Sequence, residues 1–303
     1  MKRSIKPCAI VFLLTILTFS CQRKETDMEK TLDIQGHRGA RGLMPENTIP
    51  AFLEALKIGA TTLELDLAVT KDKELLVSHE PYINATYCLD SSGNEISKDQ
   101  EKSFNIYQMS YEEVKSYDCG SKPHVHFPQQ QKFKVRKPLL KNVVEAVDEY
   151  LKSSDGKKVN YNIEIKSSPS GDDIYHPGPA EFSGLVYDFI QEHLDPEQVN
   201  VQSFDFRILQ YFHEKYPDIT LAVLIGSEED IDKNLDQLGF TPEIYSCAYK
   251  LLTAEKVKYL QKKNMQVIPW TINDSKDMER IIGWGVDGII TDYPDRTMAL
   301  LKK

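Results

Sequence analysis

The chain has 303 residues, of which 41% are hydrophobic and 27% charged, so it holds enough apolar material for a sizeable core. That length fits one α/β barrel, typically about 250 residues, or two smaller domains. The formal net charge of -9 argues against nucleic acid as a partner, because binding nucleic acid requires a basic surface.

The first 20 residues are typical of an export signal. Basic residues precede an apolar run at 8–19, which is shorter than the roughly 20 apolar residues of a membrane-spanning helix. The run ends at a serine followed by Cys21, which resembles the lipid-attachment site of a bacterial lipoprotein. We expect residues 1–20 to be a signal peptide and 21–30 a tether behind a lipidated Cys21; ordinary signal-peptidase cleavage is the alternative. The protein is then exported, faces the periplasm or cell surface, and touches the membrane only through its lipid anchor.

After the tether, strand-like and helix-like segments alternate. Apolar, β-branched stretches predict strands at 32–37, 61–67, 159–165, 199–203, 219–225, 244–247, 266–271 and 288–291. Segments with helical periodicity lie between them, and a helical tail starts at residue 295. Eight alternations close a TIM (β/α)8 barrel, so we predict one α/β domain over residues 31–303. An open doubly wound sheet is the alternative, but no GxGxxG follows the first strand.

A polar insertion at about 82–137 interrupts the alternation and has only one helix-like segment, at 109–117. Such long excursions usually act as a lid or a substrate wall, although simple decoration is an equal alternative. The insertion contains Cys88 and Cys119. An export signal permits a disulfide between them, and free thiols are equally compatible with the sequence.

Acidic residues recur where two predicted strands end. In TLELDL, Glu64 and Asp66 are two residues apart, so their side chains share one face of a strand. In NIEIK, Glu164 places a third carboxylate near the end of the next predicted strand. Buried carboxylates on one face repel one another unless a cation lies between them, and oxygen ligands suit Mg²⁺ or Ca²⁺. Acids in water on an edge strand are the alternative.

Basic and aromatic residues accompany these acids. His37 and Arg38 follow the first strand, and His79 follows a short extended segment, so two imidazoles are available as acid and base. Lys166 shares a face with Glu164 and could hold a phosphate oxygen, although such a pair alone is more often a surface ion pair. Trp270 ends a later strand and either walls the pocket or packs in the core.

Two further residues receive structural interpretations. Asp292, at the end of the last predicted strand, either adds to the candidate site or is a turn or capping residue. Asn47 is expected to be the N-cap of the helix that follows it.

Taken together, these segments resemble the successive signatures of the glycerophosphodiester phosphodiesterase family. The matching segments run in the family's order from residue 35 to residue 295 and read HRGARGLMPENTIPAF, ELDLAVTKDKELLVSHE, NIEIK, QSFD, PWTIND and DGIITDYPD. The resemblance implies a metal-dependent barrel enzyme that hydrolyses glycerophosphodiesters, such as glycerophosphocholine and glycerophosphoethanolamine, to glycerol 3-phosphate and an alcohol. It also implies roles for particular residues: an acid–base pair, His37 and His79; metal ligands, Glu64, Asp66 and Glu164; and a phosphate clamp, Arg38 and Lys166.

The resemblance leaves several alternatives open. Glu80 follows His79 where the family usually has aspartate. Either histidine can be the base, and either water or the glycerol 2-hydroxyl can attack. Lysophospholipase D activity or a phosphoinositide-type phospholipase activity would use the same barrel. From another class, an inactive surface-anchored binding protein would keep the fold alone.

Overall fold

The computed structural model describes residues 31–154, 158–227 and 230–302. The expected signal peptide, the lipidated Cys21 and the tether lie outside these described residues. Within the described residues, no helix combines the length and the apolarity needed to span a bilayer.

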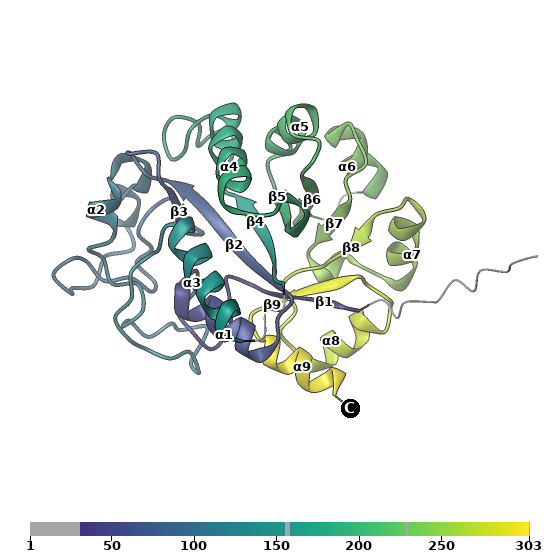
Figure 1. Cartoon of the computed structure of the whole chain (residues 1–303), viewed down its shortest axis with the longest axis horizontal. Coiled ribbons are helices and arrows are strands. Elements are labelled where there is room, and N and C mark those ends of the chain that lie inside the picture. Colours follow the sequence, from purple (N-terminus) through teal and green to yellow (C-terminus); the bar gives the residue numbers. More distant parts are fainter. Residues whose placement is uncertain (1–30, 155–157, 228–229, 303) are drawn as a thin grey trace, which may run out of the picture. The chain divides into compact units, whose positions relative to one another are not determined.

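The described chain folds into a barrel of parallel strands. Of the nine strands, β3 (Leu75–Val77) pairs antiparallel with β2, and the others follow the order β8-β7-β6-β5-β4-β2-β1-β9 through parallel pairs. Backbone hydrogen bonds from Asp287 to Val267 and from Ile290 to Pro269 join the two ends of this order (both 3.0 Å). The predicted TIM barrel is confirmed (Figure 1). The parallel strands are β1 Asp33–Gly36, β2 Thr62–Val69, β4 Asn160–Ile165, β5 Val199–Ser203, β6 Thr220–Ile225, β7 Ile244–Cys247, β8 Gln266–Val267 and β9 Gly288–Thr291.

Helices surround the strands in Figure 1. The apolar side chains of the strands and of these helices pack together in one hydrophobic cluster. On β2, Leu63, Leu65 and Leu67 are completely buried in the main hydrophobic cluster, which also includes the helices' apolar faces. Burial of each such leucine stabilises the fold by roughly 1.5–3 kcal/mol. The surrounding helices are α1 Ile49–Ile58, α3 Leu140–Ser153, α4 Pro179–His193, α5 Phe206–Lys215, α6 Ile231–Leu238, α7 Ala254–Lys262, α8 Ser275–Ile282 and α9 Pro294–Leu301, with short helices η3 Pro196–Gln198 and η4 Tyr249–Leu251 between them.

The predicted insertion runs from β3 to α3 and has a small hydrophobic core of its own. Its regular elements are η1 Glu101–Ser103, η2 Ile106–Gln108 and α2 Tyr111–Val114. Buried apolar residues, among them Ile83, Ile106 and Val114, form a cluster separate from the barrel core. The insertion is therefore more ordered than its polar sequence predicts.

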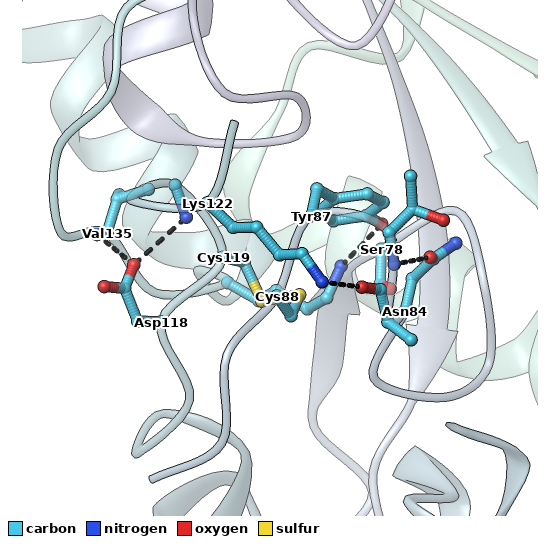
Figure 2. The surroundings of a disulfide bond; sticks show 12 residues. Ser78, Asn84, Tyr87, Cys88, Asp118, Cys119, Lys122 and Val135 are labelled. Carbon is cyan, nitrogen blue, oxygen red and sulfur yellow. Dashed lines mark hydrogen bonds between the residues drawn. A yellow bond between two sulfur atoms is a disulfide. The ribbon is translucent and has the colours of Figure 1, made fainter. Parts of the chain in front are cut away.

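A disulfide joins Cys88 to Cys119 inside this insertion. Figure 2 shows the bond with Lys122 beside it, whose Nζ donates to the carbonyl oxygen of Ala85 at 2.7 Å. Asp118, next to one cysteine, accepts a hydrogen bond from the backbone N–H of Val135 at 3.3 Å. These contacts tie the two ends of the insertion's polypeptide together.

We expect the disulfide to contribute to stability. Because its cysteines are 31 residues apart, the closed loop restricts the unfolded chain by an amount worth roughly 3–4 kcal/mol. Urea unfolding should therefore show a lower free energy of unfolding for the double variant Cys88→Ala/Cys119→Ala. Dithiothreitol should destabilise the unsubstituted protein and leave the double variant unchanged. Equal stability of the oxidised and reduced unsubstituted protein would contradict this assignment.

Candidate active site

The carboxyl ends of β2 and β4 bring three acidic side chains together. Glu64 and Asp66 point to the same face of β2, and Asp66 is in register with Glu164 on β4. One oxygen from each carboxylate lies within 4.8 Å of the others, and all three residues are buried. Oδ1 of Asp66 has no hydrogen-bond partner among the described residues. The acids grouped from the sequence therefore form one cluster.

When ionised, the three carboxylates repel one another strongly, because little water reaches them to screen their negative charges. Burial raises the pKa of Glu64 well above its usual range, and the charges of Asp66 and Glu164 raise it further. Burial also raises the pKa of Glu164. Burial opposes ionisation of Asp66 as well, but the charges of Arg38, His79 and Lys166 together outweigh burial and lower the pKa of that carboxyl. An Mg²⁺ or Ca²⁺ ion would fit this set of oxygen ligands and would relieve the repulsion.

Arg38 lies beside the acidic cluster, in the loop after β1. Its backbone is left-handed (φ 52°), and its N–H donates to Oε2 of Glu64 at 2.8 Å. The buried guanidinium donates from Nη1 to Oε1 of Glu46 at 2.7 Å, and its Nε lies 3.3 Å from Oδ2 of Asp66. Arg38 thus supplies positive charge and a backbone donor to two of the three acids.

Glu46 and Asn47 hold the side chains of Arg38 and Asp66 in place through hydrogen bonds. Oε2 of Glu46 accepts from Nε of Arg41 at 2.6 Å, and Nδ2 of Asn47 donates to Oδ2 of Asp66 at 2.8 Å. The expectation that Asn47 caps α1 is wrong. Thr48 is the N-cap, with its side chain accepting from the N–H of Ala51, so the Asn47 amide is free to reach the cluster.

His37 is held by a carboxylate from the last strand of the barrel. Its Nδ1 lies 2.6 Å from Oδ1 of Asp292, whose Oδ2 accepts from Nδ2 of Asn273 at 2.6 Å. Burial lowers the pKa of His37, and the charge of Asp292 only partly offsets this. Burial disfavours the Asp292 carboxylate, yet the charge of His37 and its hydrogen bond bring the pKa of Asp292 to about 2. Of the two interpretations of Asp292, a place in the site is supported, whereas the N-cap of α9 (Pro294–Leu301) is Tyr293.

His79 follows β3 and has a carboxylate of its own. Its Nδ1 lies 2.9 Å from Oε1 of Glu80, and Oε2 of Glu80 accepts from the hydroxyl of Tyr87 at 2.8 Å. Glu80, where the resemblance implies an aspartate, therefore has its carboxylate at hydrogen-bond distance from the imidazole. About a third of the His79 side chain (31%) is exposed.

One cavity of about 200 Å³ collects most of the predicted site residues. His37 and His79 both line it, so the two imidazoles face the same space. Trp270 also lines it and stands edge-on to Phe204, while its Nε1 donates to the carbonyl oxygen of Ser246 at 3.0 Å. Trp270 therefore both lines the pocket and packs against its neighbours, so the two alternatives for this residue are both correct. The other lining residues are Arg38, Arg41, Glu64, Glu164, Gln202, Leu224, Thr271 and Ile290.

A second cavity of about 340 Å³ shares His79, Glu164 and Phe204 with the first. Lys166 lines it, and its Nζ lies 2.6 Å from Oε1 of Glu164 and 3.8 Å from Oδ1 of Asp66. Burial alone would lower the pKa of Lys166, but Glu164 and Asp66 raise it. Of the site residues named from the sequence, all but Asp66 line one of these two adjoining cavities, and Asp66 contacts the lining residues Arg38 and Lys166.

Sequence reasoning missed several residues of this site. Gln202 on β5 donates from Nε2 to Oε1 of Glu64 at 2.9 Å, and Phe204 borders both cavities. QSFD contains both residues, but nothing in its spacing distinguishes them. Glu46 and Asn47 were visible as an acid–amide pair beside the HRG motif, and only the three-dimensional structure reveals their buried partners.

The comparisons with known proteins agree with this geometry. The sequence model of the Glycerophosphoryl diester phosphodiesterase family matches residues 37–296. A glycerophosphodiester phosphodiesterase of Bacillus altitudinis is 34% identical, over 88% of this chain and 97% of its own. A solved protein of Silicibacter pomeroyi named for the same family is 26% identical, with a TM-score of 0.80 over 90% of this chain and 94% of its own.

A further solved structure supports the fold alone. It is an Oleispira antarctica phosphodiesterase in complex with the product sn-glycerol-3-phosphate. It is 19% identical, with a TM-score of 0.70 over 89% of this chain and 97% of its own.

We expect Mg²⁺ or Ca²⁺ to bind the acidic cluster with release of a proton. Burial raises the pKa of Glu64, so its carboxyl holds a proton in the metal-free protein at a pH where an ordinary glutamate is ionised. Isothermal titration calorimetry in buffers of different ionisation enthalpy should therefore give different apparent enthalpies.

Glu64→Gln should weaken metal binding and abolish the buffer dependence. The matched control is Glu54→Gln, on the partly exposed surface of α1, which should bind metal as the unsubstituted protein does. Buffer-independent enthalpies in the unsubstituted protein would contradict proton release.

Proposed function

Since the chain belongs to the glycerophosphoryl diester phosphodiesterase family and is a phosphoric diester hydrolase, we propose that it converts glycerophosphodiesters to glycerol 3-phosphate and an alcohol. Glycerophosphocholine and glycerophosphoethanolamine are the expected substrates. The observation that carries the proposal is the common cavity of His37 and His79, next to three buried carboxylates. The Oleispira phosphodiesterase, whose fold this chain shares, was solved with sn-glycerol-3-phosphate as its own product.

The proposal includes one divalent cation, Mg²⁺ or Ca²⁺, held by Glu64, Asp66 and Glu164. Two observations support the fit. One carboxylate oxygen from each of the three residues lies within 4.8 Å of the other two. In addition, Oδ1 of Asp66 lacks a hydrogen-bond partner among the described residues. When bound, such an ion supplies positive charge to the phosphate oxygens.

Arg38 and Lys166 form the proposed phosphate clamp. Both cations lie against the acidic cluster, Arg38 beside Asp66 and Lys166 beside Glu164. Their charges lie where negative charge accumulates on the phosphate during transfer, in a site with little water. Fixed cations there stabilise the transition state without having to reorganise.

His37 is the proposed general base. Burial lowers its pKa and favours the neutral imidazole, and the bond between Nδ1 and Asp292 leaves Nε2 to accept a proton. The attacking oxygen, from water or from the glycerol 2-hydroxyl, gives up that proton. His79 is then the general acid, which protonates the departing alcohol.

The two cavities accommodate the two halves of the substrate. The smaller one, with His37 and Trp270, suits glycerol, because its volume of about 200 Å³ is small for a glycerol that carries an acyl chain. The larger one borders His79 and extends to Tyr82 and Tyr175, so it suits the departing alcohol. This partition favours deacylated substrates over lysophospholipids and phosphoinositides.

The features of residues 1–30 carry a separate proposal. We propose that residues 1–20 are removed as a signal peptide and that Cys21 anchors an exported enzyme to a membrane. Residues 31–303 then form one catalytic domain. Metabolic labelling with a palmitate analogue, compared between the full chain and Cys21→Ser, tests the anchor.

The function is tested with a panel of glycerophosphocholine, glycerophosphoethanolamine, glycerophosphoinositol and lysophosphatidylcholine. We expect release of glycerol 3-phosphate from the deacylated compounds, its loss with EDTA, and its recovery with Mg²⁺ or Ca²⁺. His37→Ala and His79→Ala should each lower kcat on the order of 10²- to 10⁴-fold, whereas His193→Ala on the outer helix α4 should not. Preferential cleavage of lysophosphatidylcholine would favour lysophospholipase D. The absence of any turnover would favour a binding protein.

Replacement of Asp292 by Asn tests the role of His37. Asp292 raises the pKa of His37, so without its charge the pKa falls and the imidazole stays neutral to lower pH. The acid limb of kcat/KM should therefore move to lower pH. At the plateau, kcat should fall on the order of 10²- to 10⁴-fold because the ring loses its orientation. Asp295→Asn, an exposed neighbour, serves as the control. An unmoved acid limb would show that His37 is not the base.

A further inference from the structure

The insertion places two buried residues behind Glu80, the carboxylate that holds His79. The hydroxyl of Tyr87 donates to Oε2 of Glu80 at 2.8 Å, and Nζ of Lys137 lies 3.3 Å from the same hydroxyl. Oε1 of Glu80 faces Nδ1 of His79 at 2.9 Å. Tyr87 and Lys137 are only 5% and 2% exposed, so a continuous buried chain of polar contacts leads from the insertion to the imidazole.

We propose that Tyr87 and Lys137 are positioning residues for His79 and act through Glu80. The inference rests on the proposed acid–base role of His79 and extends it to the insertion. Neither residue lines the two cavities described above, so their effect on substrate is indirect.

The contact chain fixes Glu80 because each of its carboxylate oxygens has a different partner. If the hydroxyl of Tyr87 is removed, Oε2 loses its donor and the carboxylate can rotate, which releases the ring of His79. The hydrogen bond from His79 and the charges of His79 and Lys137 outweigh burial and lower the pKa of Glu80. Glu80 is thereby kept as a carboxylate that accepts both bonds.

Lys137 has no carboxylate partner at hydrogen-bond distance among the described residues. Burial lowers its pKa, and the charges of Glu80 and Glu46 only partly offset this. Its Nζ also lies 5.2 Å above the centre of the Tyr87 ring. A lysine buried at this cost is better explained by its position behind Glu80 than by packing.

The insertion fixes Tyr87 and Lys137 at opposite ends of its sequence. Tyr87 directly precedes Cys88 of the disulfide, and Figure 2 shows the ring beside that bond. The ring also stacks on His124, with centroids 5.8 Å apart. Lys137 precedes Pro138, whose carbonyl accepts from the N–H of Val77 on β3 at 2.9 Å. The insertion therefore supports one of the two histidines through Glu80.

The test compares Tyr87→Phe and Lys137→Met with the unsubstituted enzyme on glycerophosphocholine. We expect kcat to fall roughly 10- to 100-fold with KM nearly unchanged, because the contact chain orients His79 and does not bind substrate. Tyr117→Phe is the matched control, since that ring belongs to the same insertion and packs on Phe104. It should keep its kcat.

A double-mutant cycle with Glu80→Gln separates positioning from a general loss of folding. If Tyr87 acts through Glu80, Tyr87→Phe should lower kcat little further in the Glu80→Gln background. Multiplicative losses would overturn the inference, as would a normal kcat in Tyr87→Phe when His79→Ala is inactive. Normal turnover in His79→Ala would instead overturn the proposed function itself. If Tyr87→Phe fails to fold, Lys137→Met in the same cycle gives the decision.

Discussion

Repulsion among three buried carboxylates is the constraint around which this site is arranged. Glu64, Asp66 and Glu164 would be costly to ionise side by side in a place that water hardly reaches. The loop after β1 therefore turns back so that Arg38 reaches two of them with its N–H and its guanidinium. Lys166 approaches from β4. Arg38 and Lys166 thus supply positive charge that stabilises the three carboxylates, and the oxygens of the cluster still suit a divalent cation.

The two histidines lie in one cavity but have different structural support. His37 is held by Asp292, so its support belongs to the barrel and crosses from the first strand to the last. His79 is held by Glu80, and the partners of Glu80 come from the insertion. The support of His37 thus depends on the geometry of the closed parallel strands. The support of His79 depends on a segment that barrels of this kind can vary in length and sequence without changing their strands.

Prediction from sequence succeeded where the relation between residues is local and periodic. Alternating apolar segments identified the barrel, and the period of two along a strand placed Glu64 and Asp66 on one face. It failed where the partner is distant in sequence. Asp292 lies 255 residues from His37, and no local pattern distinguishes it from a turn residue. Asn47 was misread because asparagine favours helix caps, whereas the adjacent Thr48 takes that place. The support from Tyr87 required the folded insertion.

The disulfide next to Tyr87 has a consequence for when such an enzyme would become active. Disulfides form in oxidising compartments and are kept reduced in the cytosol. The described barrel strands include neither disulfide cysteine, so the barrel can form without the bond that joins the two parts of the insertion. Complete support of His79 would then arise only after oxidation of Cys88 and Cys119. With the proposed export, full hydrolytic capacity would then be acquired only after the chain reaches an oxidising compartment.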